Sequence, residues 1–313
     1  MEWRPGASPA TLAERARLLM RTRDFFRVRG VMEVQTPVLC GYAVPTPQID
    51  SFAVADPVRF LRTSPEFAHK RLLAAGCGDI YELGPVFRSG ELGARHNAEF
   101  TLLEWYRLGI DEHELMREVA LLISALLPDT ARQPRYLTYA EALRRHASID
   151  LWRDDVRALR AAIESATELP QAALSRDDLL DLVFATVVAP AFEPDRVTFV
   201  HDYPATQASL AALADHDPNV ARRFEAYVGP LELANGFYEL RDATEQRSRF
   251  DQDNMRRDVL GKPRVTADER FLAALASGLP ACAGVALGFD RVVMLATGSG
   301  HIRQTLAFDF NHA

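Results

Sequence analysis

The segment from Phe87 to Arg107 reads FRSGELGARHNAEFTLLEWYR, and it constrains the fold more than any other part of the chain. A loop rich in glycine and charge opens with an arginine and leads into a run of strand-like residues. Residues two apart share one face of an extended strand. One face is then polar and aromatic (Phe100, Leu102, Glu104, Tyr106) and the other is plain core (Thr101, Leu103, Trp105).

The first of these faces lies beside a cationic loop. A ring that can stack, a carboxylate and a hydroxyl suit a ligand with a flat base, phosphates and an ammonium group. The alternative interpretation is an amphipathic strand with a charged hairpin loop and no ligand.

The composition of the chain is that of an ordinary globular protein. Its 313 residues suit one large α/β domain or two smaller ones, and 48% are hydrophobic. No apolar run approaches the roughly 20 residues that span a bilayer, and the N-terminus has no apolar signal core. The three cysteines have no metal-type spacing. We therefore expect a cytoplasmic protein with reduced thiols and no membrane partner.

The charge balance does not favour nucleic acid, because the net charge is −7. One basic stretch stands out on the first predicted helix (Arg15, Arg17, Arg21, Arg23, Arg27, Arg29). It is either a solvated helix face or a docking surface for an acidic partner protein.

Apolar periodicity, caps and turn residues predict the elements in outline. The first helix begins at Ser8 as N-cap, with Pro9 in its first position, and ends near Gly30. Strands are predicted over residues 31–39, 58–66, 79–87, 99–107 and 197–204. Residues 112–194 are helical by pattern, 232–240 form a hairpin, 243–261 a polar helix, and 284–298 a strand that runs into a helix.

No repeat or linker interrupts the chain. We expect an α/β fold of the α+β kind, in which strands from both ends of the sequence share one antiparallel sheet flanked by helices. Residues 112–194 would be a helical insertion, and residues 1–313 one domain.

The predicted hairpin over 232–240 brings two acids together. Asn235-Gly236 is the preferred pair for a two-residue type I′ turn, which would place Glu232 opposite Glu239 with Cβ atoms about 5 Å apart. Two carboxylates so close repel each other unless a cation lies between them. That cation could be Mg²⁺, a substrate ammonium group or both. The alternative is a solvent-exposed hairpin with screened charges.

The segment GVALGFDR (284–291) places a glycine before a helix that carries an arginine. Gly288 would let backbone approach a ligand, and Arg291 would meet phosphate or stack on a base. The chain has neither a GxxxxGK[ST] loop nor a GxGxxG after a strand, so a nucleotide site of the P-loop or Rossmann type is excluded.

These pieces, in this order, resemble a known family. A helix followed by a strand that ends at Pro37 resembles motif 1 of the class II aminoacyl-tRNA synthetases, FRSGELGARHNAEF their motif 2, and GVALGFDR their motif 3. The segments TSPE (63–66), LEWY (103–106) and ELANGFYEL (232–240) are similar to lysyl-tRNA synthetases in particular. The resemblance covers essentially the whole chain and implies the catalytic fold of that class.

Within this family the chain is similar to the elongation factor P–(R)-β-lysine ligases, which are truncated relatives of lysyl-tRNA synthetases. TFVHDYPATQASLA, ELANGFYEL and GVALGFDRVVMLA carry the similarity. We expect the anticodon-binding domain of the synthetases to be absent, because motif 1 starts close to Met1. Ala286 stands where lysyl-tRNA synthetases usually have glycine, and its methyl group would reshape the amino-acid pocket, which is consistent with a β-amino acid.

The resemblance implies a nucleotide site for ATP with Mg²⁺. Arg88 would contact the α-phosphate and the substrate carboxylate, His96 and Arg291 the outer phosphates, and Phe100 and Arg291 would enclose adenine. The implied site is completed by Ser89, Gly90, Asn97, Glu232, Leu233 and Gly288, with Glu232 and Glu239 as the Mg²⁺ ligands.

The resemblance also implies an amino-acid pocket and an acceptor. The pocket would be lined by Ser64, Pro65, Glu66, Glu104, Tyr106, Glu239 and Ala286. Arg88, Glu239 and Arg291 would act in catalysis. The implied substrates are (R)-β-lysine, or lysine, and a lysine of elongation factor P, with no tRNA, in a homodimer formed through motif 1. The alternatives are a lysine-activating enzyme that charges tRNA and an inactive regulatory relative.

One position departs from the synthetase pattern. Their motif 2 has a glutamate two residues after its arginine, where this chain has Gly90 followed by Glu91. Either backbone N–H groups replace that carboxylate or Glu91 takes its place.

Overall fold

The computed structural model describes residues 3–55, 58–130, 132–168 and 174–313. The chain forms two compact units. The first combines Met1–Asp111 with Glu239–Ala313, and the second is Glu112–Tyr238. The prediction of one domain over residues 1–313 stays a prediction.

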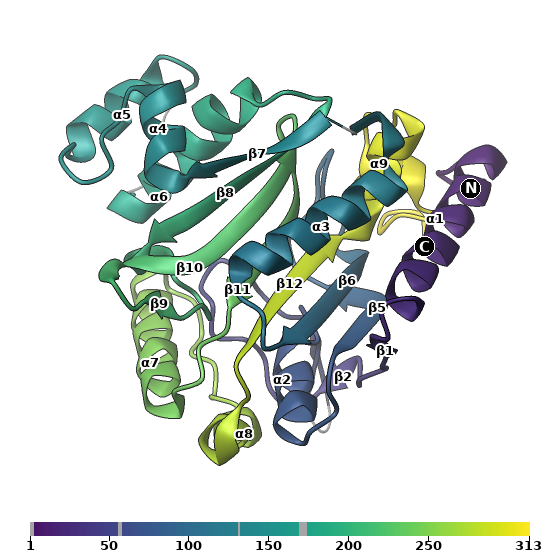
Figure 1. Ribbon diagram of the computed structural model, residues 1–313, viewed down its shortest axis with the longest axis horizontal. Helices are drawn as coiled ribbons and strands as arrows, with labels where there is room; N and C mark the ends of the chain where they lie inside the picture. The colour runs from purple at the N-terminus through teal and green to yellow at the C-terminus, as the bar shows by residue number, and fades with distance from the viewer. Residues whose placement is uncertain (1–2, 56–57, 131, 169–173) are drawn as a thin grey trace. The chain divides into compact units, whose positions relative to one another are not determined.

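The sheet of the first unit is built around three antiparallel strands (Figure 1). Strand β6 (Glu99–Leu108) pairs on one side with β5 (Ile80–Phe87) and on the other with β12 (Cys282–Gly288). Strand β1 (Met32–Glu33) adds to β5 in parallel. The prediction that strands from both ends of the sequence share an antiparallel sheet is confirmed within this unit.

Helices α1 (Pro9–Arg27) and α9 (Phe289–Thr297) pack against each other, and α9 packs on β6 (Figure 1). Helix α1 starts as predicted, since the Ser8 side chain caps it by accepting from the Thr11 N–H. Phe26 of α1 stacks on Tyr81 and meets the edge of Trp105. The Trp105 face of β6 is therefore core, as its alternation predicts.

The other helices of the first unit are α2 (Glu66–Ala74), α7 (Ala243–Val259) and α8 (Glu269–Gly278). Phe67 of α2 stacks on Phe271 of α8, and Phe250 of α7 packs against both rings. A small second sheet has the order β2 (Leu39–Cys40), β4 (Arg59–Leu61), β3 (Ala53–Val54), and a 3₁₀ turn covers Ile302–Thr305.

The second unit has its own strands. Strand β10 (Asp217–Val228) lies antiparallel between β8 (Arg196–Pro204) and β11 (Leu231–Tyr238). Strand β7 (Arg132–Thr138) runs parallel to β8, and β9 (Leu213–Ala214) pairs with β10.

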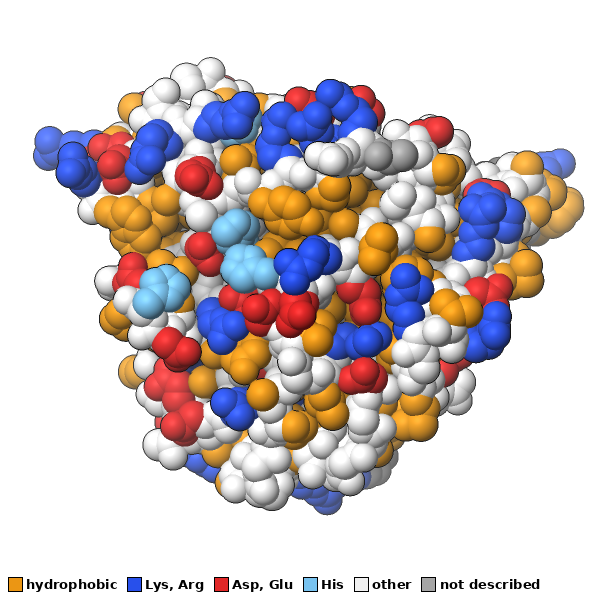
Figure 2. Space-filling model, viewed as in Figure 1, with side chains coloured by type: hydrophobic (Ala, Val, Ile, Leu, Met, Phe, Trp, Pro, Cys, Tyr) orange, Lys and Arg blue, Asp and Glu red, His pale blue; other side chains and the backbone are white. Residues whose placement is uncertain are grey.

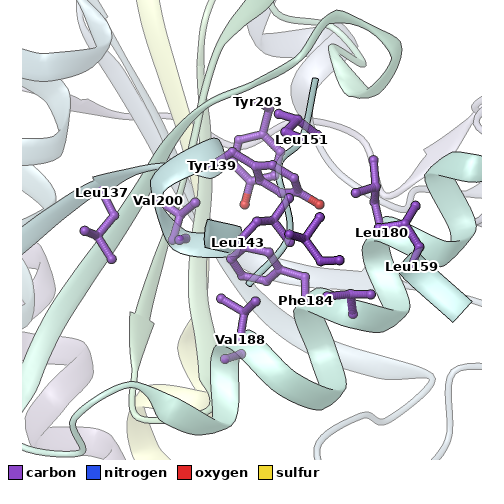
Figure 3. Packing of buried hydrophobic residues seen from close by; sticks show 14 of the residues in the cluster. Leu137, Tyr139, Leu143, Leu151, Leu159, Leu180, Phe184, Val188, Val200 and Tyr203 are labelled. Carbon is purple, nitrogen blue, oxygen red and sulfur yellow. The ribbon is translucent and has the colours of Figure 1, made fainter. Parts of the chain in front are cut away.

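The helices of this unit are α3 (Glu112–Leu126), α4 (Tyr139–Ala147), α5 (Val156–Glu164) and α6 (Arg176–Val183), which continues as a π turn over Phe184–Val188. Short 3₁₀ turns cover Pro128–Thr130, Ala189–Ala191 and Ala205–Gln207. Leu143, Leu180 and Phe184 lie in one buried cluster with Val200 of β8 (Figure 3). None of the helices in the described residues is both long and apolar enough to cross a membrane.

The predicted hairpin over 232–240 is wrong. Asn235 and Gly236 lie inside β11, opposite Glu225 and Phe224 of β10, and Glu232 lies opposite Tyr227. The chain turns instead at Gly229-Pro230, where Gly229 has a φ of +54°. A long partner strand that the pattern did not predict pairs with Asn235 and Gly236 as part of a ladder of hydrogen bonds, which outweighs the local turn preference of Asn-Gly.

Two other predicted elements differ in extent. The strand over 31–39 shrinks to two short pieces, and the one over 58–66 ends at Leu61, a few residues before helix α2 begins at Glu66. The helical pattern over 112–194 contains a strand, β7.

Candidate active site

The predicted site residues divide between the two units. Glu232 and Leu233 lie in β11 of the second unit, and all the others lie in the first. Glu232 lies near the start of β11 and Glu239 directly follows the end of this strand, so the two acids are not cross-strand neighbours. The roles predicted for Glu232 and Leu233 stay predictions.

Glu104 is the centre of the predicted ammonium site on β6. Its buried carboxylate accepts hydrogen bonds from Ser64 Oγ at 2.7 Å and from the Tyr106 hydroxyl at 2.9 Å. Ser64 also accepts from the backbone N–H of Glu66, just after Pro65, the N-cap of α2. The alternation of β6 and the start of α2 thus bring Ser64, Glu104 and Tyr106 together, as the sequence predicts.

Glu66 and Glu239 meet at a buried lysine that the sequence prediction missed. Lys70 Nζ lies 2.7 Å from Glu66 Oε1 and 2.6 Å from Glu239 Oε2, and the lysine is completely buried. Glu66 and Lys70 are four residues apart on α2, a spacing that places them on one helix face. That spacing was the one sequence signal that could have linked Lys70 to Glu66.

Burial changes the acid–base behaviour of this cluster. It raises the pKa of Glu239 to about 8 in spite of the Lys70 charge, and it also raises the pKa of Glu66. Burial opposes the charge on Lys70, but the carboxylates of Glu239 and Glu66 outweigh it and hold the lysine pKa above its usual range. The Tyr106 pKa is raised by burial and by the nearby carboxylates, so its hydroxyl stays a donor. The pocket is poised to give up a proton when a cation enters.

A glycine on β12 makes this cluster possible. Gly284 is paired with Tyr106 in the ladder, and a Cβ atom there would overlap the Tyr106 ring and Oε1 of Glu239. Two residues on, Ala286 lies opposite Glu104, and Gly288 lies opposite Leu102. Cross-strand neighbours have Cβ atoms about 5 Å apart, so the Ala286 methyl group borders the Glu104 end of the pocket, where it was predicted to act.

A second layer behind Glu104 contains His69, which the sequence prediction also missed. His69 Nε2 lies 3.0 Å from Glu82 and its Nδ1 lies 3.6 Å from Glu104. Burial disfavours the charged imidazole, but the nearby carboxylates of Glu104 and Glu82 outweigh it and raise the His69 pKa. Glu82 is also bonded by Arg62 at 2.7 Å, and despite its burial the His69, Thr36 and Arg62 bonds lower its pKa to about 2. These hydrogen bonds hold His69 in place, and its Nδ1 meets Glu104 as an electrostatic contact without a hydrogen bond.

Arg88 follows β5 and lies at the other end of the same sheet face. Its guanidinium carbon is 5.1 Å from the centroid of the Phe100 ring, and Glu91 Oε1 is 3.8 Å from its Nη1. Gly90 has a φ of +82°, a conformation that favours glycine. Glycine therefore suits position 90 better than the glutamate that the synthetases have there. Of the two replacements considered for that glutamate, backbone N–H groups or Glu91, the contact between Glu91 and Arg88 agrees with the second. Ser89 anchors the loop through its N–H to the Asp50 carbonyl.

The motif 2 loop and α9 meet through His96 and Arg291. Arg291 Nη2 donates to His96 Nε2 at 2.8 Å. Burial and the positive charge of Arg291 lower the His96 pKa, so the imidazole is neutral and can accept. The two residues predicted to bind outer phosphates therefore lie together.

The Asn97 side chain forms hydrogen bonds with other residues of the chain. Its Nδ2 donates to the Glu99 carbonyl at 2.7 Å, and its Oδ1 accepts from the Phe310 N–H at 3.1 Å. The second of these bonds ties the C-terminal segment to the motif 2 loop. The contact of Asn97 with a nucleotide stays a prediction.

The contacts of Glu239 do not fit its predicted role as an Mg²⁺ ligand together with Glu232. Glu239 Oε2 already lies 2.6 Å from the buried ammonium group of Lys70, which takes the place that a metal ion would need. Within the described ranges, no group of three or more His, Cys, Asp or Glu side chains is arranged to hold a metal ion.

The two ends of the sheet face define what the site can hold. Phe100 and Glu104 are four residues apart on β6, which corresponds to about 14 Å along a strand. One end offers guanidinium groups and a ring, and the other offers buried carboxylates. This arrangement suits a ligand with phosphates and a base at one end and an amine at the other.

Comparisons with known proteins identify the family of this chain. The family described as "tRNA synthetases class II (D, K and N)" matches residues 1–312. The chain is 44% identical to the elongation factor P–(R)-β-lysine ligases of Pseudoalteromonas translucida and Klebsiella pneumoniae, and 42% identical to that of Hamiltonella defensa. Each of these alignments covers 99% of this chain and 98% of the relative.

Proposed function

Because the chain belongs to the class II tRNA synthetases, and within them to the elongation factor P–(R)-β-lysine ligases, we propose that it activates (R)-β-lysine with ATP and transfers it to a lysine of elongation factor P. The observation that carries this proposal is the set of contacts around β6. Glu104 of β6 accepts hydrogen bonds from Ser64 and Tyr106 beside the cluster of Glu66, Lys70 and Glu239. The Phe100 ring, four residues away on the same strand, has its centroid 5.1 Å from the Arg88 guanidinium carbon.

The first step joins the amino acid to AMP. The substrate carboxylate attacks the α-phosphate of ATP, the bond to the β-phosphate oxygen breaks, and pyrophosphate leaves. Arg88 neutralises charge between carboxylate and phosphate, and Arg291 with neutral His96 receives the outer phosphates. The carboxylates at the other end hold the ammonium groups, so catalysis consists mostly of positioning and charge neutralisation.

The second step transfers the aminoacyl group. The ε-amine of a lysine on elongation factor P attacks the adenylate carbonyl, an amide bond forms, and AMP leaves. The attacking amine must first lose a proton, because only the neutral amine has a free electron pair. His69, the buried histidine nearest the ammonium end, is held by its hydrogen bond to Glu82, and its Nδ1 lies 3.6 Å from Glu104.

ATP–pyrophosphate exchange tests this proposal. We expect exchange with (R)-β-lysine well above exchange with α-lysine. Glu239→Gln removes one carboxylate charge at nearly constant volume, so we expect it to abolish exchange while the protein stays folded by circular dichroism. Absence of exchange with both amino acids would refute the proposed activation.

The proposal includes Mg²⁺, a dimer and a cytoplasmic location. Mg²⁺ usually reaches such sites on the phosphates of ATP, and titration of the exchange reaction with Mg²⁺ tests this. Apolar side chains are exposed on α1 and just after it, at Met20, Val28 and Met32, which supports a homodimer through this region. A monomeric mass in solution would contradict the dimer.

A further inference from the structure

The buried ammonium group of Lys70 lies inside the pocket assigned to the ammonium groups of the substrate. It is within 2.7 Å of Glu66 and 2.6 Å of Glu239, and its charge lies 5.8 Å from the centroid of the Phe271 ring. The lysine is fully buried, and Glu239 is 1% exposed. Two of the three carboxylates predicted to bind substrate are thus held by the protein's own cation.

Stability alone does not explain such an arrangement. Burying an ion pair costs desolvation that its Coulomb attraction only partly offsets, and a hydrophobic replacement is often as stable. Oε1 of Glu239 also has no hydrogen-bond partner among the described residues. A buried acceptor left open in this way indicates that a further donor binds there.

The charge count of the cluster matches the substrate of the proposed function. When Glu66, Glu104 and Glu239 are ionised and the neighbouring His69 is neutral, the three carboxylates carry three negative charges, and Lys70 cancels one. The remaining charge of minus two complements a ligand with two ammonium groups, which is the case for (R)-β-lysine and for α-lysine. Without Lys70 the pocket would hold one negative charge too many.

We propose that Lys70 is a positioning and specificity residue: its ammonium group fixes Glu66 and Glu239 and sets the pocket charge for a substrate with two ammonium groups. This proposal rests on the proposed function. Lys70 is not a catalytic residue in it, since it acts on the substrate through the two carboxylates that it holds.

Chemical rescue of Lys70→Ala tests the proposal. The substitution removes three methylene groups and the ammonium, so n-propylammonium replaces what is lost, and n-propanol has a similar shape without the charge. Exchange with (R)-β-lysine is measured for wild type first, then for the variant alone and with each additive. We expect the KM for (R)-β-lysine to rise at least about tenfold with a smaller change in kcat, and n-propylammonium, but not n-propanol, to restore it.

Three results would overturn the proposal: a wild-type KM in the folded variant, equal rescue by both additives, or rescue by neither. If Lys70→Ala does not fold, Lys70→Arg and Lys70→Met replace it. The arginine keeps the charge and should stay closer to the wild-type KM than the methionine, and equal KM values would again contradict the proposal. A wild-type protein without exchange would instead refute the proposed function, so the two failures are distinguishable.

Discussion

At the scale of single residues, Gly284 shows how backbone sets the chemistry of the pocket. The Tyr106 ring and the Glu239 carboxylate both occupy the space that a Cβ atom at this position would take. The sequence marks the position only as one glycine in a strand. Its need for glycine becomes clear from the ladder that pairs Gly284 with Tyr106.

We therefore predict that Gly284→Ala displaces Tyr106 and Glu239. Overpacking should cost about 1–3 kcal/mol of unfolding free energy, and exchange with (R)-β-lysine should fall by about 10²-fold. Gly300→Ala is the matched control, because no atom lies within 4 Å of a Cβ built there. Denaturant unfolding and exchange kinetics check both variants, and equal behaviour of the two would contradict the packing argument.

The residues of the pocket were predictable to different degrees. Ser64, Glu104 and Tyr106 were predictable because strand alternation and a motif place them on one face. Lys70 and His69 were missed because no helix was predicted over residues 66–74, so neither residue was assigned to a helix face. Only the fold shows that this face of α2 is buried against acids.

At the scale of elements, the arginines of α1 turn out to be different from one another. Arg15 bonds to the buried Asp290 of α9 and, at 2.7 Å, to Thr101 of β6. Arg17, Arg23 and Arg27 instead pair with nearby acids at the surface. The solvated-face interpretation therefore fits the surface arginines, while Arg15 joins three elements of the first unit.

Arg15→Met and Arg27→Met should separate these two roles. Burial raises the pKa of Asp290, and loss of Arg15 leaves that carboxyl without its cation, at a cost of about 3–5 kcal/mol. Arg27 pairs with Asp24 in the open, so its loss should cost about 0–1 kcal/mol. Urea unfolding of both variants measures the difference, and similar losses would contradict the assignment of Arg15 to the core.

The elements were predictable where the signal is local. The start of α1 and the extents of β5, β6 and α7 follow from caps and periodicity. Strand β11 was not predictable in this way, because its Asn-Gly pair favours a turn. Its pairing with β10 depends on contacts between residues that are apart in the sequence, which a local pattern does not show. Because β11 is a continuous strand and not a hairpin, Glu232 does not lie opposite Glu239 as predicted.

At the scale of the whole molecule, charge and family point to a protein acceptor. The net charge is −7, and on the face shown in Figure 2 basic side chains are interspersed with acidic ones. Proteins that bind tRNA tightly usually neutralise many phosphates with clustered Lys and Arg. The curated relatives, which are matched over 98% of their length, are named for ligation to elongation factor P.

The most direct test is the identity of the acceptor. The protein is incubated with ATP, Mg²⁺ and (R)-β-lysine, together with elongation factor P and tRNA in one reaction, and the mass of the factor and the acid-stable label on the RNA are measured. We expect the factor to gain the mass of one β-lysyl group through an amide on a single lysine, with no label on tRNA. An unchanged factor mass with labelled tRNA would contradict the account.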